Sequence, residues 1–181
     1  MNKQNLKKAF TLVELVIAIA VFSIFSLGAV SVIVPISNLY TESLKVSDAK
    51  LMAFDIAAAI ENELAFAVED EQFPLLISDG AGAGEGNQLA FMGKYYQTYF
   101  STSPGGALEE NYLYISRGKE AAEYELFYDV KYYKNNHVIV YFSEGGEDVI
   151  SMRIEIMDGR DRLLYSLNRN IVPLALYAAR S

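Results

Sequence analysis

The segment from Phe10 to Ile36 constrains the chain most, because it is apolar throughout and carries one formally charged side chain, Glu14. At a rise of about 1.5 Å per residue, a helix of this length exceeds the roughly 20 residues needed to cross a bilayer. We therefore expect residues 10–36 to form a transmembrane helix. A secretory signal has a shorter apolar region, followed by small residues at a cleavage site. Here the small residue, Ala9, precedes the run.

Charge on the two sides of the run predicts its orientation and limits what the body binds. Lys3, Lys7 and Lys8 precede the run, which predicts a single-pass protein with a cytoplasmic N-terminus and an external body. Without these three, 12 of the 15 basic residues remain against 23 acidic ones, a balance of −11. Such an acidic body repels phosphates, so we expect no direct nucleic-acid partner. The absence of cysteine excludes disulfides and thiolate metal sites.

Helical periodicity continues beyond the membrane edge. In residues 37–70, apolar side chains recur at near-helical spacing, with charged residues on the other faces. They are Leu39, Leu44, Leu51, Phe54, Ala58 and Leu64. Pro35 lacks an N–H, so we expect a kink or a locally loosened helix near residues 31–35. The arm is then one helix of roughly 55 residues, transmembrane in its first half and amphipathic in its second.

Residues 71–181 carry strand and turn signals instead. Side chains alternate from Tyr124 to Tyr133, and Asn135 and Asn136 then supply a positive-φ turn that predicts a hairpin into a strand at 138–144. Further strands are expected at 149–158 and 163–167, and weaker ones at 89–93 and 112–116. The strand expected at 149–158 has one apolar face, formed by Ile150, Met152, Ile154 and Ile156. The pattern predicts an α+β fold, an antiparallel meander with the amphipathic half of the helix packed across it.

The start of the chain, KKAFTLVEL followed by the apolar run, resembles the signal of type IV prepilins and pseudopilins. In that family a prepilin peptidase, a membrane aspartyl protease, cuts before the phenylalanine, and the new N-terminus is methylated. The resemblance implies a cut between Ala9 and Phe10, removal of residues 1–9 as a cytoplasmic leader, and N-methylation of Phe10. The processing motif is completed by Lys7, Lys8, Thr11, Leu12, Val13 and Glu14. The family usually has glycine where this chain has Ala9.

The same resemblance gives Glu14 a role. A lone carboxylate in hydrocarbon costs on the order of 3 kcal/mol or more, and it persists where a partner of opposite charge is supplied. In the family, this glutamate pairs with the α-amino group of the N-terminal phenylalanine of a neighbouring subunit, which here implies an assembly salt bridge between Glu14 and Phe10. Methylation leaves the positive charge of the amine in place. The alternative is that Glu14 snorkels to the headgroups of a plain membrane anchor.

The resemblance further implies a pilin-like structural subunit, a minor pilin or pseudopilin. Its partners would be the membrane, the prepilin peptidase and methyltransferase, other pilin subunits in a helical filament, and an assembly platform protein with its ATPase. It would leave the inner membrane for a cell-surface pilus or pseudopilus that serves motility, adhesion, DNA uptake or type II secretion. The alternative is a signal-anchored extracytoplasmic binding domain that does not polymerise. We expect neither enzyme activity nor a cofactor.

Other features give weaker signals for sites. A phosphate-binding loop is suggested by Gly80, Gly82, Gly84 and Gly86, but no Gly-Lys-Ser/Thr follows, which favours a flexible loop. His137 lies beside a predicted turn without partners for a metal or a nucleophile. The acidic runs at 69–71 (Glu69, Asp70, Glu71) and at Asp158 with Asp161 offer oxygens to Ca²⁺ without EF-hand spacing, so we expect solvated turns and no metal site. The 13 tyrosines indicate half-buried strand residues or, alternatively, an adhesive aromatic face.

Overall fold

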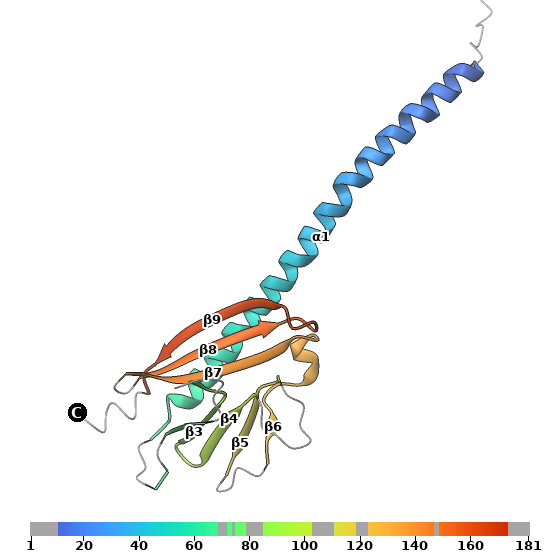
Figure 1. Cartoon of the computed structure of the whole chain (residues 1–181). Helices are drawn as coiled ribbons and strands as arrows, with labels where there is room; N and C mark the ends of the chain where they lie inside the picture. Colours follow the sequence, from blue (N-terminus) through green and yellow to red (C-terminus); the bar gives the residue numbers. More distant parts are fainter. Residues whose placement is uncertain are drawn as a thin grey trace, which may run out of the picture. The chain divides into compact units, whose positions relative to one another are not determined.

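The computed structural model describes residues 11–68, 72–73, 75–78, 85–102, 111–118, 123–146 and 149–173. Within these ranges the chain forms a long α-helix, a short 3₁₀ helix and nine β-strands (Figure 1). They are α1 (Leu12–Leu64), β1 (Leu76–Ser78), β2 (Glu85–Gly86), β3 (Gln88–Met92), β4 (Gln97–Ser101), β5 (Tyr114–Arg117), β6 (Glu125–Leu126), η1 (Val130–Tyr133), β7 (His137–Gly146), β8 (Val149–Met157) and β9 (Leu163–Ile171). The chain divides into two compact units, Met1–Leu44 and Lys45–Ser181.

The first unit contains the N-terminal part of α1, which is apolar and uncovered. Every large apolar side chain from Leu12 to Ile36 is more than half exposed. The helix is long and apolar enough to cross a membrane, and its apolar window lies near the N-terminus. The helix assignment continues without a break through residues 31–35, with Pro35 inside α1. The kink that Pro35 suggests therefore stays a prediction.

In the second unit, α1 from Lys45 to Leu64 buries one face. The buried side chains recur every three or four residues, as one side of a helix does. They are Ala49, Met52, Ala53, Ile56, Ala57, Ile60 and Leu64. Of the apolar face predicted from the sequence, Leu64 is buried and Phe54 packs against the core, whereas Leu51 and Ala58 are exposed. Leu39 and Leu44, which belong to the first unit, are exposed as well. Alanines on the buried face bring the helix backbone close to the strands, and a prediction that favours large side chains misses them.

The strands form two antiparallel sheets and not the single meander that we expected. One sheet has the order β1-β3-β4-β5-β6, and the other has the order β2-β7-β8-β9. The chain changes sheets at Asn87, since Gly86 pairs with β7 whereas Gln88 pairs with β4. Glycine is required at the crossing, because a Cβ on Gly86 would lie 2.5 Å from the carbonyl oxygen of Ser78. The α+β prediction is confirmed, with two sheets in place of one.

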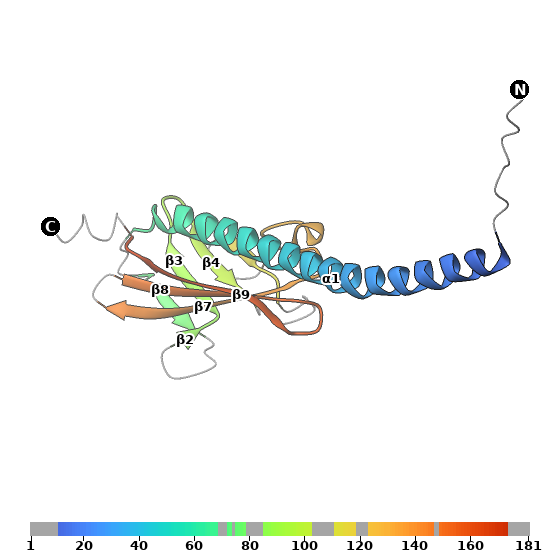
Figure 2. The same ribbon diagram turned by 90° about the horizontal axis from the view of Figure 1, so that it is seen from above.

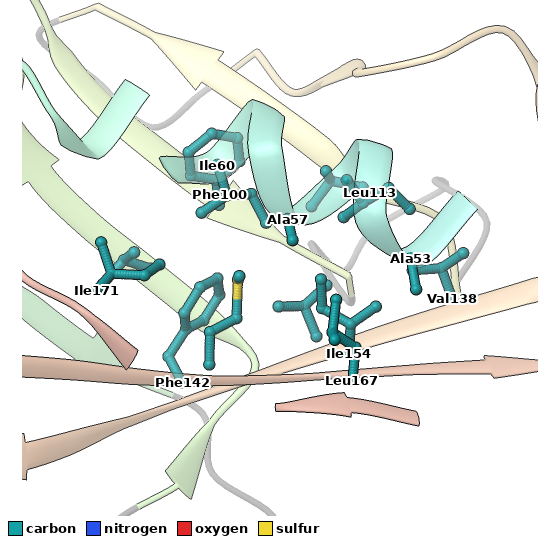
Figure 3. Close-up of a cluster of buried hydrophobic side chains, with 14 of the residues drawn as sticks. Ala53, Ala57, Ile60, Phe100, Leu113, Val138, Phe142, Ile154, Leu167 and Ile171 are labelled. Atoms are coloured by element: carbon teal, nitrogen blue, oxygen red, sulfur yellow. The ribbon is translucent and has the colours of Figure 1, made fainter. Parts of the chain in front are cut away.

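One buried cluster joins the second half of α1 to both sheets. Figures 1 and 2 show this part of α1, in teal, running along the strands. In Figure 3, Ala53, Ala57 and Ile60 of α1 face strand side chains that include Phe100 and Ile154. Each large apolar side chain buried in this way contributes roughly 1.5–3 kcal/mol. The core therefore fixes the helix against the sheets within the second unit.

Several strand predictions are confirmed. The β8 residues Ile150, Met152, Ile154 and Ile156 are at most 4% exposed, and their alternation places the other side chains of the strand on the opposite face. The weaker strands expected at 89–93 and 112–116 correspond to β3 and β5, and β9 extends past the predicted end at residue 167. Strand β4 was not predicted.

Residues 124–133 form neither the predicted strand nor a hairpin with β7. They contain the two-residue strand β6 and then η1. Asp129 caps η1, because its Oδ1 accepts a hydrogen bond from the Lys131 amide at 2.8 Å. The 3₁₀ turn places the Tyr133 ring in the core, where its hydroxyl accepts a hydrogen bond from the Leu113 amide at 3.2 Å. An aspartate cap and one well-buried tyrosine thus outweigh the alternating pattern.

The turn that follows also differs from the prediction. Positive φ occurs at Lys134 (50°) and Asn135 (63°), and not at Asn136. Lys134 is the C-terminal cap of η1 in the left-handed conformation. Its ammonium group lies 2.9 Å from the Asp48 carboxylate of α1. The turn therefore ends a 3₁₀ helix held near α1, instead of joining two strands.

Candidate functional site

The N-terminus of α1 is closed by a reciprocal pair of side chains, Thr11 and Glu14. Thr11 directly precedes the helix, and its Oγ1 accepts a hydrogen bond from the Glu14 amide at 3.3 Å. Glu14 Oε2 accepts hydrogen bonds from the Thr11 amide and the Thr11 hydroxyl, both at 2.9 Å. This is a capping box, which satisfies amide groups that the first turn of a helix leaves unpaired. Neither hydrogen bond to the carboxylate uses Oε1.

The surroundings of Glu14 are apolar. Ile17, Ala18, Val21 and Phe22 follow it along the same side of α1. Glu14 is the single formally charged side chain between residues 11 and 36. What this arrangement offers chemically is a fixed carboxylate oxygen, Oε1, on an apolar helix surface. A cationic group from another molecule is a partner with which such an oxygen can pair when water is excluded.

The described residues include part of the predicted processing motif. Leu12, Val13 and Glu14 form the first turn of α1, directly after Thr11. The other positions, Lys7, Lys8, Ala9 and Phe10, lie outside the described residues. The cut between Ala9 and Phe10, the methylation of Phe10 and its salt bridge with Glu14 therefore stay predictions. Sequence reasoning missed the capping role of Glu14, although Thr-x-x-Glu ahead of an apolar run is its usual signal.

Two of the weaker candidate sites lie at the β8–β9 turn and at the start of β7 beside it, so His137 is a strand residue and not the turn residue that we expected. His137 Nδ1 lies 2.9 Å from Asp161 Oδ1, which links the start of β7 to the β8–β9 turn. Asp158 Oδ1 accepts hydrogen bonds from the amides of Arg162 and Arg160, at 3.1 and 3.0 Å. These hydrogen bonds lower the pKa of Asp158 and commit its carboxylate to the turn.

For the remaining candidate metal and phosphate sites, the described residues show no arrangement of ligating groups. Within the ranges that the structure describes, no group of three or more acidic, histidine or cysteine side chains is placed to hold a metal ion. The acidic run at 69–71 lies outside those ranges, as do Gly80, Gly82 and Gly84. Gly86 lies in β2, where its role is the close crossing between the sheets.

Among the described residues, the tyrosines include a packed group and an exposed group. The rings of Tyr128 and Tyr132 stack with centroids 4.2 Å apart, and the Tyr132 hydroxyl donates a hydrogen bond to Asp55 Oδ2 at 3.2 Å. Burial raises the pKa of Tyr132, so this phenol stays neutral at physiological pH. Tyr95 and Tyr96, between β3 and β4, are instead 71% and 60% exposed.

The exposed tyrosines belong to a surface that sequence reasoning did not locate. Tyr95 and Tyr96 share a groove with Phe66, which follows the end of α1 and is 61% exposed. Lys94 Nζ lies 5.1 Å from the centroid of the Tyr95 ring. We call Phe66, Lys94, Tyr95 and Tyr96 the aromatic tip. No local pattern signals it, because Phe66 and the β3–β4 turn are far apart in sequence.

Comparison with known proteins concerns the N-terminal segment. A family model, the prokaryotic N-terminal methylation motif, matches residues 4–30. No curated protein and no solved structure matches the chain. The motif is the type IV prepilin signal, so the resemblance inferred from KKAFTLVEL is confirmed. Together with a long helix packed on antiparallel sheets, it supports a type IV pilin-like protein with a membrane-anchoring helix.

Proposed function

We propose that the chain is a type IV pilin-like structural subunit, a minor pilin or pseudopilin. Prepilin peptidase removes residues 1–9 by cutting between Ala9 and Phe10, and the new amine of Phe10 is methylated. Residues 10–36 hold the subunit in the inner membrane with its body outside. An assembly platform protein and its ATPase then move it into a pilus or pseudopilus with other pilin subunits. In this role the protein is structural and has no catalytic activity.

The observation that carries this proposal is the junction of the prepilin signal with an uncovered apolar helix. The signal match at residues 4–30 overlaps the part of α1 whose large apolar side chains are all exposed. A surface of this kind is unfavourable in water and requires lipid or other apolar helices as its surroundings. A subunit that passes from a membrane to the helical core of a filament meets both environments in turn.

Glu14 serves the two stages differently in this account. Before assembly, Oε2 is held by the amide and hydroxyl groups of Thr11, which lowers the cost of keeping a carboxylate at the edge of the membrane. In the filament, the charge of Glu14 is balanced by the α-amino group of Phe10 from a neighbouring subunit. The capping box keeps the carboxylate at the first turn, so Thr11 positions the oxygen that Phe10 requires.

The test compares Glu14→Gln with a control on the same helix, Glu42→Gln, in a bacterium that makes type IV assembly machinery. Quantitative blotting measures the precursor, the processed membrane pool and the sheared surface filaments. For Glu14→Gln we expect normal cutting and membrane insertion and a filament fraction reduced roughly tenfold or more, because a buried amine has lost its counter-ion. Glu42→Gln assembles like the parent, since Glu42 lies beyond the apolar run.

Two results would contradict the proposal. If Glu14→Gln enters filaments as readily as the parent, the carboxylate has no role in assembly. If the parent itself never leaves the membrane, the chain is a signal-anchored extracytoplasmic binding domain that does not polymerise.

A further inference from the structure

The aromatic tip is exposed, but its backbone is held in place. The Gly93 amide donates a hydrogen bond to the Tyr96 carbonyl at 2.9 Å, which closes the turn between β3 and β4. The Val68 amide donates a hydrogen bond to the Met92 carbonyl at 2.8 Å, which ties the segment after Phe66 to the end of β3. The three aromatic residues of the tip are at least 60% exposed. Because their backbone is ordered before anything binds, a ligand of these rings loses less free energy to ordering.

The groove beside these rings has the size of a small-ligand site. Its volume is about 400 Å³, and small-ligand pockets measure roughly 300–1,000 Å³. The rings of Tyr95 and Tyr96 have centroids 6.3 Å apart, and their planes are inclined at 59°. Inclined rings form the walls of a groove instead of one flat platform. The groove therefore fits a single extended chain better than a flat surface.

Polar groups line the same groove. The Arg117 guanidinium of β5 pairs with the Glu63 carboxylate of α1, and these side chains are 46% and 32% exposed. In the described part of the chain this is their one mutual hydrogen bond, so Glu63 Oε2 can still accept and the guanidinium can still donate. An occupant that covered the pair without hydrogen-bonding to it would leave these groups desolvated and unpaired. The groove therefore requires an occupant with hydrogen-bonding groups as well as an apolar face.

Net charge limits the occupant further. Beyond residue 9 the chain has a balance of −11, which repels polyanions such as nucleic acids and acidic polysaccharides. Lys94 adds one positive charge at the groove, and its ammonium nitrogen lies 5.1 Å from the centroid of the Tyr95 ring. A single exposed cation does not offset the charge of the whole body. A neutral occupant meets no such repulsion.

We propose that the groove binds a neutral, β-linked pyranose chain, a segment of a glucose or N-acetylglucosamine polymer. The axial C–H groups of such rings form apolar faces that pack on aromatic side chains. The hydroxyl groups at the ring edges donate to Glu63 and accept from Arg117. A proline-rich peptide also packs on aromatic grooves, but its proline nitrogens have no hydrogen to donate to Glu63. This binding is additional to the proposed function and does not depend on assembly.

Saturation-transfer NMR on the full chain, in micelles of a detergent without a sugar headgroup, tests this site with cellotetraose and chitotetraose. We expect the parent to bind at least one of them, and Tyr95→Ala to weaken that binding roughly tenfold through loss of a ring contact. Tyr95→Phe keeps the ring and binds like the parent. Arg117→Met keeps the apolar stem, removes the donors and weakens binding as well. The matched control is Tyr40→Ala on α1, because Tyr40 is 65% exposed and lies outside the groove.

An acidic probe of the same length, a β-linked glucuronate tetramer, binds at least several-fold more weakly than the neutral ones if charge selects the occupant. The proposal is overturned if neither neutral tetrasaccharide binds the parent, if Tyr95→Ala binds as well as Tyr40→Ala, or if the acidic tetramer binds equally well. A proline-rich peptide that binds through Tyr95 when the saccharides do not would also overturn it. Each of these results leaves the proposed function standing, because the assay involves no filament.

Discussion

Ala57→Leu and Ala58→Leu form a matched pair that tests which face of α1 carries the fold. Ala57 is 2% exposed and belongs to the core cluster, whereas its neighbour Ala58 is exposed. The two changes are chemically identical, so helix propensity contributes equally to both. At position 57 the added isopropyl group enters a packed core, which costs about 1–3 kcal/mol. At position 58 it meets solvent, and the free energy of unfolding changes by less than about 0.5 kcal/mol.

The assay is thermal unfolding of the full chain in detergent micelles, followed by near-ultraviolet circular dichroism. The signal comes from tyrosine, since the chain has 13 tyrosines and no tryptophan. For Ala57→Leu we expect the melting temperature of the body to fall by roughly 3 to 12 °C, and for Ala58→Leu to stay near that of the parent. Equal melting temperatures for the two variants, or a larger fall for Ala58→Leu, would refute the assignment of the buried face.

Four further outcomes follow from the same structure. Ala9→Gly is cut at least as well as the parent, whereas Ala9→Leu accumulates as precursor on blots. Normal maturation of Ala9→Leu would show that the cleavage site is not between Ala9 and Phe10. A fragment starting near Asn38 is soluble, folded and monomeric by size-exclusion chromatography, because the sheets cover the buried face of α1. An insoluble product would show that the assigned domain boundary is wrong. The free energy of unfolding of that fragment falls as pH rises above about 10, because burial raises the pKa of Tyr132 in the folded state and the same phenol ionises at lower pH in the unfolded chain. Tyr132→Phe reduces this loss of stability, which alkaline denaturation measures. Thr11→Val removes the hydroxyl of the capping box, which lowers the stability of the first helical turn by about 1 kcal/mol. On blots of sheared fractions it therefore enters filaments less well than Thr11→Ser.

The features that were predicted correctly are those that depend on a short stretch of the sequence and not on tertiary contacts. The prepilin signal is a short contiguous motif beside an apolar run, and both can be recognised without tertiary contacts. The alternation in β8 follows from one buried face of a strand, so Ile150 to Ile156 were placed correctly. The glutamate inside the apolar run also stood out, because a charge there demands an explanation.

The errors concern choices that depend on distant parts of the chain. Ala57 lies in the core and Leu51 is exposed because the helix packs closely on two sheets, and side-chain size alone does not reveal that distance. Residues 124–133 alternate like a strand, but Asp129 and the buried Tyr133 stabilise a 3₁₀ turn. The division into two sheets depends on Gly86 crossing close to Ser78, a contact between separate strands. The aromatic tip is likewise assembled from segments that only the fold brings together.

The identity of the mature N-terminus decides between a filament subunit and a permanently anchored domain. Filaments are sheared from cells that make the assembly machinery, and the N-terminal peptide is identified by mass spectrometry. We predict a chain that begins at Phe10 with a methylated α-amino group, recovered from both the membrane and the sheared fraction. A chain that keeps Met1 or residues 2–9, or one that begins at Phe10 but never reaches the sheared fraction, would contradict the account.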